Sequence, residues 1–233
     1  MSQPSFLTGS WSETGTVRTN NEDAMAATAR LLAVADGVGG RPAGEVASAV
    51  AVAVLRASFE RGVGIEEAVQ AAHEVVQTAS RCNSLLHTMV TTLTAAAIQD
   101  GSIVLAHIGD TRAYLLSGGE LQPLTTDQTA EAKLIAEGKA DEAAKLRNPK
   151  ALAQVVGGRQ ERLEPVVSKV EMGPGDRLFL CTDGVSGYLS DGDMGRLLSE
   201  TQDVQAAAEA VCKAALEAGS NDNVTAVVAD LSG

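Results

Sequence analysis

Two apolar runs that lie far apart in the chain each end in an aspartate followed by a glycine. Residues 31–34 lead through Ala35 into Asp36-Gly37, and residues 178–181 lead through Thr182 into Asp183-Gly184. An aspartate at the end of a buried strand presents its carboxylate at the rim of a sheet, and the glycine lets the backbone turn away. A third acidic turn, Asn221-Asp222-Asn223, precedes the apolar run 224–228. Because buried charges are costly unless they are paired or bound to a metal, these turns predict a cation site if they meet in space.

The residue types favour a hard metal ion. Asp23, at the end of the polar stretch 18–23, adds a fourth candidate carboxylate. The chain has no HExxH or CxxC pattern, and carboxylate oxygens favour Mg²⁺ or Mn²⁺ over zinc. Each of these aspartates taken singly is also typical of a turn or a helix cap, so the prediction depends on the set.

The overall charge limits the class of partner. The 233 residues carry a net charge of −12, which argues against a nucleic-acid backbone or an anionic membrane surface as the main partner. A phosphorylated substrate stays possible because a bound cation can reverse the local field. No run approaches the ~20 apolar residues of a membrane span, and the three cysteines have no framework spacing, so we expect a cytoplasmic protein.

The pattern of apolar residues predicts strands and helices in an order that excludes a doubly wound parallel sheet. We expect two mostly antiparallel sheets with helix pairs on their outer faces, in an α+β fold of one domain over residues 1–233. An exposed, partly helical insertion is expected at about 137–150. The predicted strands are 6–12, a hairpin within 24–35, a β-meander over 91–98, 102–108, 111–116 and 120–124, then 165–170, 177–181 and 224–231. The predicted helices are 47–59, 65–86, 130–137, 191–199 and 204–218.

The glycine-rich stretch that starts at Gly37 matches neither common nucleotide-binding motif. Glu45 follows Gly44 where a P-loop needs lysine, and Pro42 stands where a dinucleotide fingerprint needs its last glycine. The stretch therefore reads as a tight turn that carries Asp36.

An ordered set of short motifs gives the sequence a family resemblance. The chain resembles the metal-dependent serine/threonine protein phosphatases of the protein phosphatase 2C type, in particular their compact bacterial signalling members. The matching pieces follow the family's order over nearly the whole chain: Arg18-x-x-x-Glu22-Asp23, 34–40 with Gly44-Glu45-x-Ala47-Ser48, Thr91-Thr92-Leu93, 108–112 with Tyr114, 124–127, Gly175-Asp176-Arg177 with 181–184, and 222–225.

The resemblance implies a four-layer α/β/β/α sandwich and two Mn²⁺ or Mg²⁺ ions, with a weaker third ion position. Asp36 would bridge the two ions, the Gly37 carbonyl would bind one of them, and Asp183 and Asp222 would hold the other. Asp127 would hold the third ion with Asp183. The remaining roles fall to Arg18, which would grip the substrate phosphate, to Glu22 and Asp23, which would anchor metal-bound water, and to Asn223, which would support the ligands from behind.

The implied reaction is hydrolysis of phosphoserine and phosphothreonine on proteins by a metal-activated water, with Arg18, Asp36 and Asp183 as the catalytic residues. The implied partners are phosphorylated proteins and a cognate kinase, and the protein would be a monomer with a mobile flap at 137–150.

Two departures from the family pattern keep other functions open. Arg41 stands where many members have a histidine, and arginine cannot give up a proton near neutral pH, so the acid for the leaving group is undefined. Gln128 follows Asp127 where histidine is frequent. The alternatives are a catalytically weak regulatory or phosphoprotein-binding module on the same fold, and a phosphatase of small phosphoesters.

Overall fold

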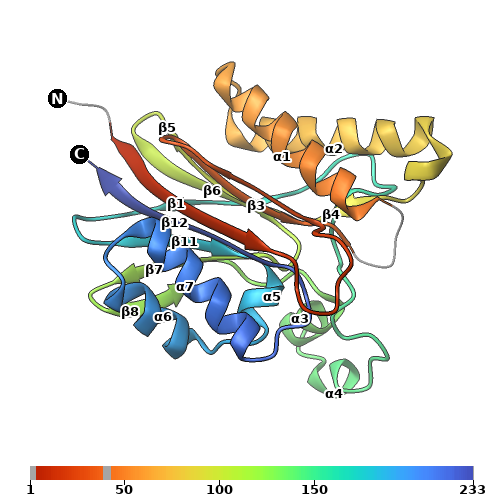
Figure 1. The fold of residues 1–233 in the computed structure, drawn as a ribbon. Helices are drawn as coiled ribbons and strands as arrows, with labels where there is room; N and C mark the ends of the chain where they lie inside the picture. Colours follow the sequence, from red (N-terminus) through yellow and green to blue (C-terminus); the bar gives the residue numbers. More distant parts are fainter. Residues whose placement is uncertain (1–3, 39–42, 233) are drawn as a thin grey trace.

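The computed structural model describes residues 4–38 and 43–232 and contains two antiparallel sheets packed face to face (Figure 1). The first sheet has the strand order β1 (Ser5–Glu13), β12 (Val224–Ser232), β11 (Arg177–Cys181), β7 (Arg112–Ser117), β8 (Glu120–Pro123). The second has the order β10 (Val166–Val170), β6 (Ser102–Ile108), β5 (Leu93–Gln99), β3 (Leu31–Asp36), β2 (Asp23–Ala27). A short ladder joins β4 (Val90–Thr91) to β9 (Val156–Gly157).

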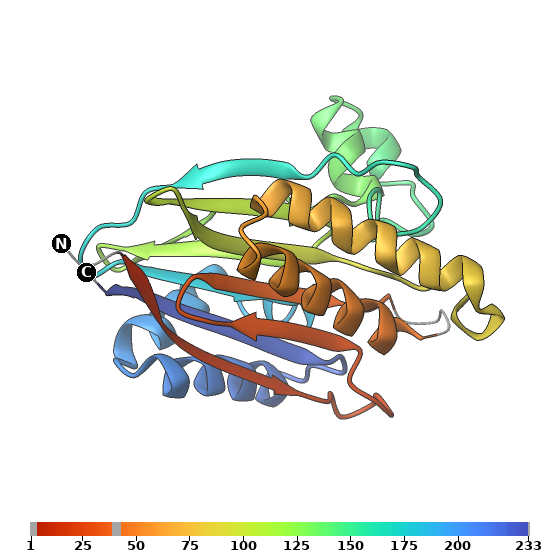
Figure 2. The same ribbon diagram turned by 90° about the horizontal axis from the view of Figure 1, so that it is seen from above.

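A helix pair covers the outer face of each sheet, which confirms the four-layer α/β/β/α sandwich (Figures 1 and 2). Helices α1 (Gly44–Glu60) and α2 (Ile65–Cys82) pack on the second sheet, and α6 (Asp191–Glu200) and α7 (Val204–Glu217) pack on the first. The short helices are α3 (Ala130–Ala136), α4 (Ala140–Ala143), α5 (Asp183–Ser186) and a 3₁₀ turn at Ser84–Leu86. In the described part of the chain no helix is long and apolar enough to cross a membrane.

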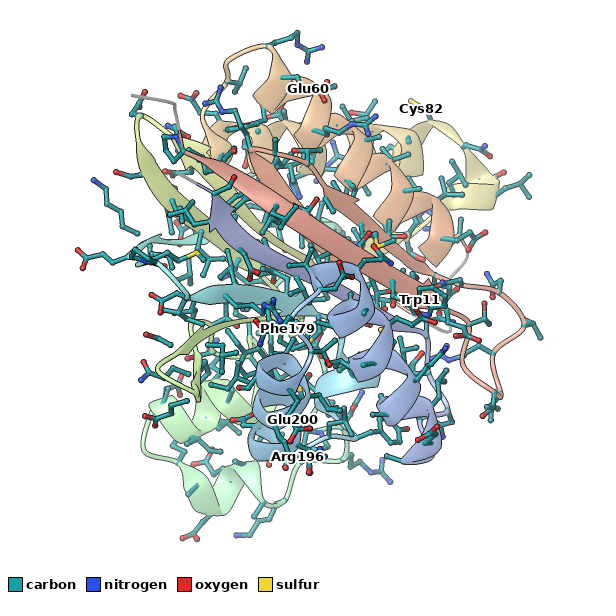
Figure 3. All side chains as sticks on the ribbon, turned by 60° about the vertical axis from the view of Figure 1, so that its left-hand side comes forward. Trp11, Glu60, Cys82, Phe179, Arg196 and Glu200 are labelled. Atoms are coloured by element: carbon teal, nitrogen blue, oxygen red, sulfur yellow. The ribbon has the colours of Figure 1, made fainter. Side chains whose placement is uncertain are left out.

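The layers are held together by three apolar clusters, one between each helix pair and its sheet and one between the sheets. Phe179 of β11 is fully buried in the cluster under α6 and α7, whereas Cys82, at the end of α2, is exposed (Figure 3). Strand β3 is buried along its whole apolar run because sheet neighbours, α1 and the opposite sheet enclose it. This burial is what carries the run 31–34 into the interior and leaves Asp36 at its end.

The β-meander predicted over 91–124 is wrong. Strands β6 and β7 belong to different sheets, so the chain makes two hairpins that lie in opposite layers. The crossing occurs at Gly109, whose φ of 104° suits glycine and where an added Cβ would collide with the side chain of Thr92. The hydroxyl of Thr94 lies 2.9 Å from Nδ1 of His107 and 2.7 Å from the hydroxyl of Thr111, which ties both sides of the crossing together. Each hairpin buries an apolar face, and placing them in separate layers buries both.

The segment predicted as an insertion, 137–150, directly follows α3 and forms α4 and the turns around it, and most of its side chains are exposed. It lies at the end of the sandwich opposite the two chain termini (Figure 1). The helix predicted over 65–86 ends at Cys82, where the side chain of Asn83 accepts a hydrogen bond from the Leu85 backbone and starts the 3₁₀ turn.

One buried arginine fastens α6 to the first sheet. Arg177 is 6% exposed and donates two hydrogen bonds, of 2.8 and 2.9 Å, to the carboxylate of Asp230. The same guanidinium donates to the carbonyls of Leu198, Thr201 and Gln202 at 2.6–2.7 Å. These carbonyls lie at the C-terminal end of α6, where the helix leaves its last acceptors unpaired.

We expect Arg177→Met to lower the free energy of unfolding by about 2–3 kcal/mol, because Asp230 and three carbonyls lose their donors while the methionine fills a similar volume. Urea denaturation measures the change. The matched control is Arg196→Met on α6, because the exposed pair of Arg196 with Glu200 should contribute less than about 1 kcal/mol. Equal effects of the two substitutions would contradict this account of Arg177.

Candidate metal centre

The three acidic turns meet in one cavity of about 870 Å³ at an end of the sandwich. Asp36 comes from the end of β3 in the second sheet, Asp183 from the start of α5 directly after β11, and Asp222 from the turn before β12. Arg18 lines the same cavity. Neighbouring strands in each sheet run antiparallel, so the end of one strand lies beside the start of the next, which brings segments about 200 residues apart together.

The backbone of Asp36 is fixed by the edge of β5. The Asp36 amide donates to the Thr92 hydroxyl at 2.9 Å, and its carbonyl accepts from the Thr92 amide at 2.9 Å and from the Thr91 hydroxyl at 2.7 Å. The next residue must be glycine, because a Cβ at Gly37 would collide with the carbonyl of Gly44 at the start of α1. These contacts leave the Asp36 side chain as the group that faces the cavity.

Burial and mutual repulsion raise the pKa values of the gathered carboxyl groups. Burial raises the pKa of Asp36 well above its usual range, and the nearby charges of Asp23, Asp183 and Asp222 raise it further. Burial and the charge of Asp222 also raise the pKa of Asp183, while a hydrogen bond with Asp36 lowers it. The site is therefore one in which protons or cations are needed to neutralise crowded negative charge.

Two contacts supply that neutralisation. Asp36 and Asp183 share a hydrogen bond, and the Arg18 guanidinium donates to Oδ2 of Asp222 at 2.6 Å. As they stand, no three His, Cys, Asp or Glu side chains in residues 4–38 and 43–232 are arranged closely enough to hold an ion. The sequence predicted a shared site for these carboxylates, and they share a cavity. Cations can be coordinated there only if they displace the proton between Asp36 and Asp183 and the guanidinium of Arg18.

Asp23 lies behind the cavity and connects the two sheets. Its Oδ2 accepts hydrogen bonds from the hydroxyls of Thr182, at 2.9 Å, and Thr225, at 2.6 Å. Both threonines lie at strand ends of the first sheet. Its Oδ1 is buried and has no hydrogen-bond partner among the described residues. Burial raises the pKa of Asp23 to about 7. A buried acceptor without a donor fits a water molecule held at the outer coordination shell of an ion.

Glu22 and Asn223 lie beside Asp23 and hold the loop that carries Arg18. The Asn223 side chain accepts from the Glu22 amide at 2.9 Å and donates to the Asn20 carbonyl at 3.0 Å. The Glu22 carboxylate lies 3.7 Å from the Arg18 guanidinium. Asn223 therefore fixes the loop against the start of β12.

Asp127, which was predicted to hold a third ion with Asp183, is paired with Arg112. Its carboxylate accepts two hydrogen bonds of 2.8 Å from Arg112, a bidentate pair, and it does not line the cavity. Asp110 lines the cavity instead, and burial with the nearby charge of Asp183 raises its pKa to about 7. Asp110 was not among the site residues predicted from the sequence; the clue in the sequence is the Gly109-Asp110 dipeptide, which repeats the aspartate-and-glycine pairing of the main turns.

The two departures from the family pattern have different outcomes. Arg41 lies outside the described residues. Gln128 is structural: its side-chain Oε1 accepts from the Gly109 backbone amide at 2.9 Å, and its backbone N–H donates to the Gly109 carbonyl at 2.7 Å. Gln128 thus shapes the turn that presents Asp110.

The donor set fits hard divalent cations. The cavity gathers carboxylates from four segments, Asp36, Asp110, Asp183 and Asp222, and the described residues offer an outer acceptor on Asp23. Carboxylate oxygens in this number are typical ligands of Mg²⁺ and Mn²⁺.

Comparison with known proteins gives a consistent assignment. Residues 16–227 match the family model described as protein phosphatase 2C. The serine/threonine protein phosphatase PstP of Mycobacterium tuberculosis is 38% identical over 228 residues, and this alignment covers 94% of the chain and 44% of that relative. The chain thus spans less than half the length of that relative.

Solved structures agree with the sequence match. A crystal structure of the M. tuberculosis phosphatase PstP superposes with a TM-score of 0.88 at 37% identity, covering 98% of this chain and 100% of that one. The catalytic domain of PstP in complex with two manganese ions superposes with a TM-score of 0.86 at 36% identity, covering 99% and 100%. With its four-layer fold and its gathered aspartates, this chain belongs to the protein phosphatase 2C family.

Proposed function

We propose that the protein is a Mn²⁺- or Mg²⁺-dependent phosphatase that hydrolyses phosphoserine and phosphothreonine on proteins. The observation that carries the proposal is the meeting of Asp36, Asp183 and Asp222 with Arg18 in one cavity. The name of the relative PstP, a serine/threonine protein phosphatase, and the two manganese ions in its catalytic domain support it.

The aspartates divide the binding of ions among them. Asp36, the Gly37 carbonyl, Asp183 and Asp222 would hold a pair of ions. Asp110, rather than Asp127, would join Asp183 in holding a weaker third ion, because Arg112 occupies the Asp127 carboxylate. When bound, the ions supply an activated water and positive charge beside the phosphoryl oxygens.

Arg18 pairs with Asp222 at 2.6 Å in the absence of ions. With cations bound to Asp222, the guanidinium would be available to the substrate phosphate. A planar guanidinium matches two phosphate oxygens at once, so Arg18 orients the phosphoryl group.

The segment 137–150 borders the site as a flap. Asn148 and Lys150 line the cavity, and the Lys150 ammonium lies 4.0 Å from the Asp183 carboxylate. Substrate contact by this flap favours phosphoproteins over small phosphoesters. We further propose a cytoplasmic monomer with one catalytic domain over residues 1–233 that acts opposite a cognate kinase.

We expect Asp36→Ala and Asp183→Ala each to lower Mn²⁺-dependent hydrolysis of p-nitrophenyl phosphate and of a phosphothreonine peptide by at least about 10³-fold, because each substitution removes ligands and transition-state charge stabilisation. Circular dichroism should show an unchanged fold. Asp191→Ala, which removes an exposed aspartate at the start of α6, should keep full activity.

Full activity of either aspartate variant, or of the wild type in excess chelator, would refute a metal-dependent phosphatase. Retained phosphopeptide binding without any hydrolysis by the wild type would instead favour the regulatory module on the same fold. Hydrolysis of small phosphoesters alone would favour the small-molecule phosphatase.

The metal-free protein should lose stability as the pH rises from about 6.5 to 8.5. Burial raises the pKa values of Asp23 and Asp110 to about 7 and that of Asp36 well above its usual range, so in this range the native state holds more protons than the unfolded chain. The free energy of unfolding therefore falls with pH, by at least about 1 kcal/mol over the window. His73 and His107, whose pKa values burial lowers, act below about pH 6.5 and in the opposite direction.

Urea denaturation in chelator at several pH values tests this sign. Mn²⁺ should reverse the decline at pH 8.5, and Asp110→Asn should flatten it. A stability that stays constant or increases from pH 6.5 to 8.5 would mean that these carboxyl groups are not held in the protonated form.

A further inference from the structure

We propose that a pair of arginines in the same cavity, Arg81 and Arg159, binds an anionic group of the substrate beside the phosphorylated residue. The pair, called the basic wall below, would make the protein prefer phosphoproteins with an acidic side chain or a second phosphate near the target. This inference rests on the proposed phosphatase function and adds a substrate class to it.

The basic wall is exposed, and neither of its charges has an ionic partner among the residues that the structure describes. Both arginines line the cavity that also contains Asp36 and Asp183, and both are exposed. Among residues 4–38 and 43–232 no carboxylate lies within 4 Å of either guanidinium. In a chain with a net charge of −12, two unpaired guanidiniums in one cavity form a local positive region available to a ligand.

The fold fixes both arginines to one rigid unit. The buried Gln77 of α2 donates to the carbonyls of Gly158 at 3.2 Å and Gln160 at 2.7 Å, the two residues that flank Arg159. Arg81 follows Gln77 by one turn of the same helix, so it rises beside the loop that Gln77 holds.

A buried histidine strengthens this attachment. Nδ1 of His73 accepts from the Gly157 amide at 3.1 Å, and Nε2 lies 2.9 Å from the Gln160 carbonyl. The ring is thus held neutral with its proton on Nε2, and burial lowers its pKa. The loop that carries Arg159 is held at three positions, which limits the entropy lost when a ligand binds.

The chemistry of the wall favours carboxylate or phosphate. Guanidinium groups match these anions with two parallel hydrogen bonds, and side chains without a competing partner bind them most strongly. The position of Arg81 in the last turn of α2 also suits the helix dipole, but the dipole accounts neither for Arg159 nor for the cavity that both residues line.

The size and charge of the cavity also point to a substrate that extends beyond its phosphate. A volume of about 870 Å³ lies at the upper end of the usual range for ligand pockets, so it accommodates residues on either side of a phosphorylated side chain. The acidic centre repels an acidic substrate until cations bind, and the basic wall offsets this repulsion at the neighbouring positions.

The test compares three phosphothreonine peptides that differ only at two flanking positions, which hold aspartate, phosphoserine or asparagine. The double variant Arg81→Gln/Arg159→Gln removes the wall. Its matched control, Arg56→Gln/Arg61→Gln, removes the same charge from α1 and the turn after it, outside the cavity. All three proteins are assayed for kcat/KM in Mn²⁺ and for activity on p-nitrophenyl phosphate.

The wild type should prefer at least one anionic peptide over the asparagine peptide by about tenfold in kcat/KM, mainly through KM, as expected for one or two charge-assisted hydrogen bonds. The wall variant should lose this preference and keep its activity on p-nitrophenyl phosphate, while the control variant keeps both. Preference for the aspartate or for the phosphoserine peptide identifies the source of the anion.

Two results would overturn the inference: equal rates of the wild type on all three peptides, or an unchanged preference in the wall variant. Either leaves activity on p-nitrophenyl phosphate intact, so the proposed phosphatase function survives. If no substrate is hydrolysed, that function fails, and the affinities of the same peptides for the wild type and the wall variant decide on the basic wall separately.

Discussion

The crowding of buried carboxylates at one end of the sandwich is the constraint on which the rest of this structure depends. Asp23, Asp36, Asp110 and Asp183 all have raised pKa values because burial and mutual repulsion disfavour their charged forms. Such a cluster opposes folding unless it is neutralised. The hydrogen bond between Asp36 and Asp183 and the pair of Arg18 with Asp222 supply part of that neutralisation, and divalent cations complete it in the function we propose.

The scaffold keeps these groups together through hydrogen bonds between its two sheets. Asp23 begins a strand of one sheet and accepts from Thr182 and Thr225 at strand ends of the other. Asn223 holds the loop before Asp23 in the same way. Because these bonds bridge the layers, the site lies on the seam of the sandwich, and its geometry depends on how the sheets pack as much as on the strands themselves.

The cavity that contains the acidic centre also contains the basic wall, and the two are built differently. The acidic centre arises from strand ends, which the two sheets fix by their pairing. The wall arises from α2 and the loop after β9. Side chains of α2 hold that loop through hydrogen bonds with two of its backbone carbonyls and one backbone amide. In the function that we propose, the acidic centre would keep its chemistry constant while the helix and the loop set which phosphoproteins enter.

The sequence by itself determined the element types and the identity of the main acidic turns. Apolar residues at the spacing of a strand or of a helix predicted most strands and helices to within a few residues. Asp36, Asp183 and Asp222 could be selected because each adjoins a buried strand. Only the tertiary structure decided which hairpin joins which sheet, because spacing along the chain does not encode the layer in which a strand buries its apolar face. It also decided that Arg112 pairs with Asp127 while Asp110 lines the cavity with Asp183, and that Gln77 binds the backbone on both sides of Arg159. These pairings depend on side chains distant in sequence, and folding alone brings them within bonding distance.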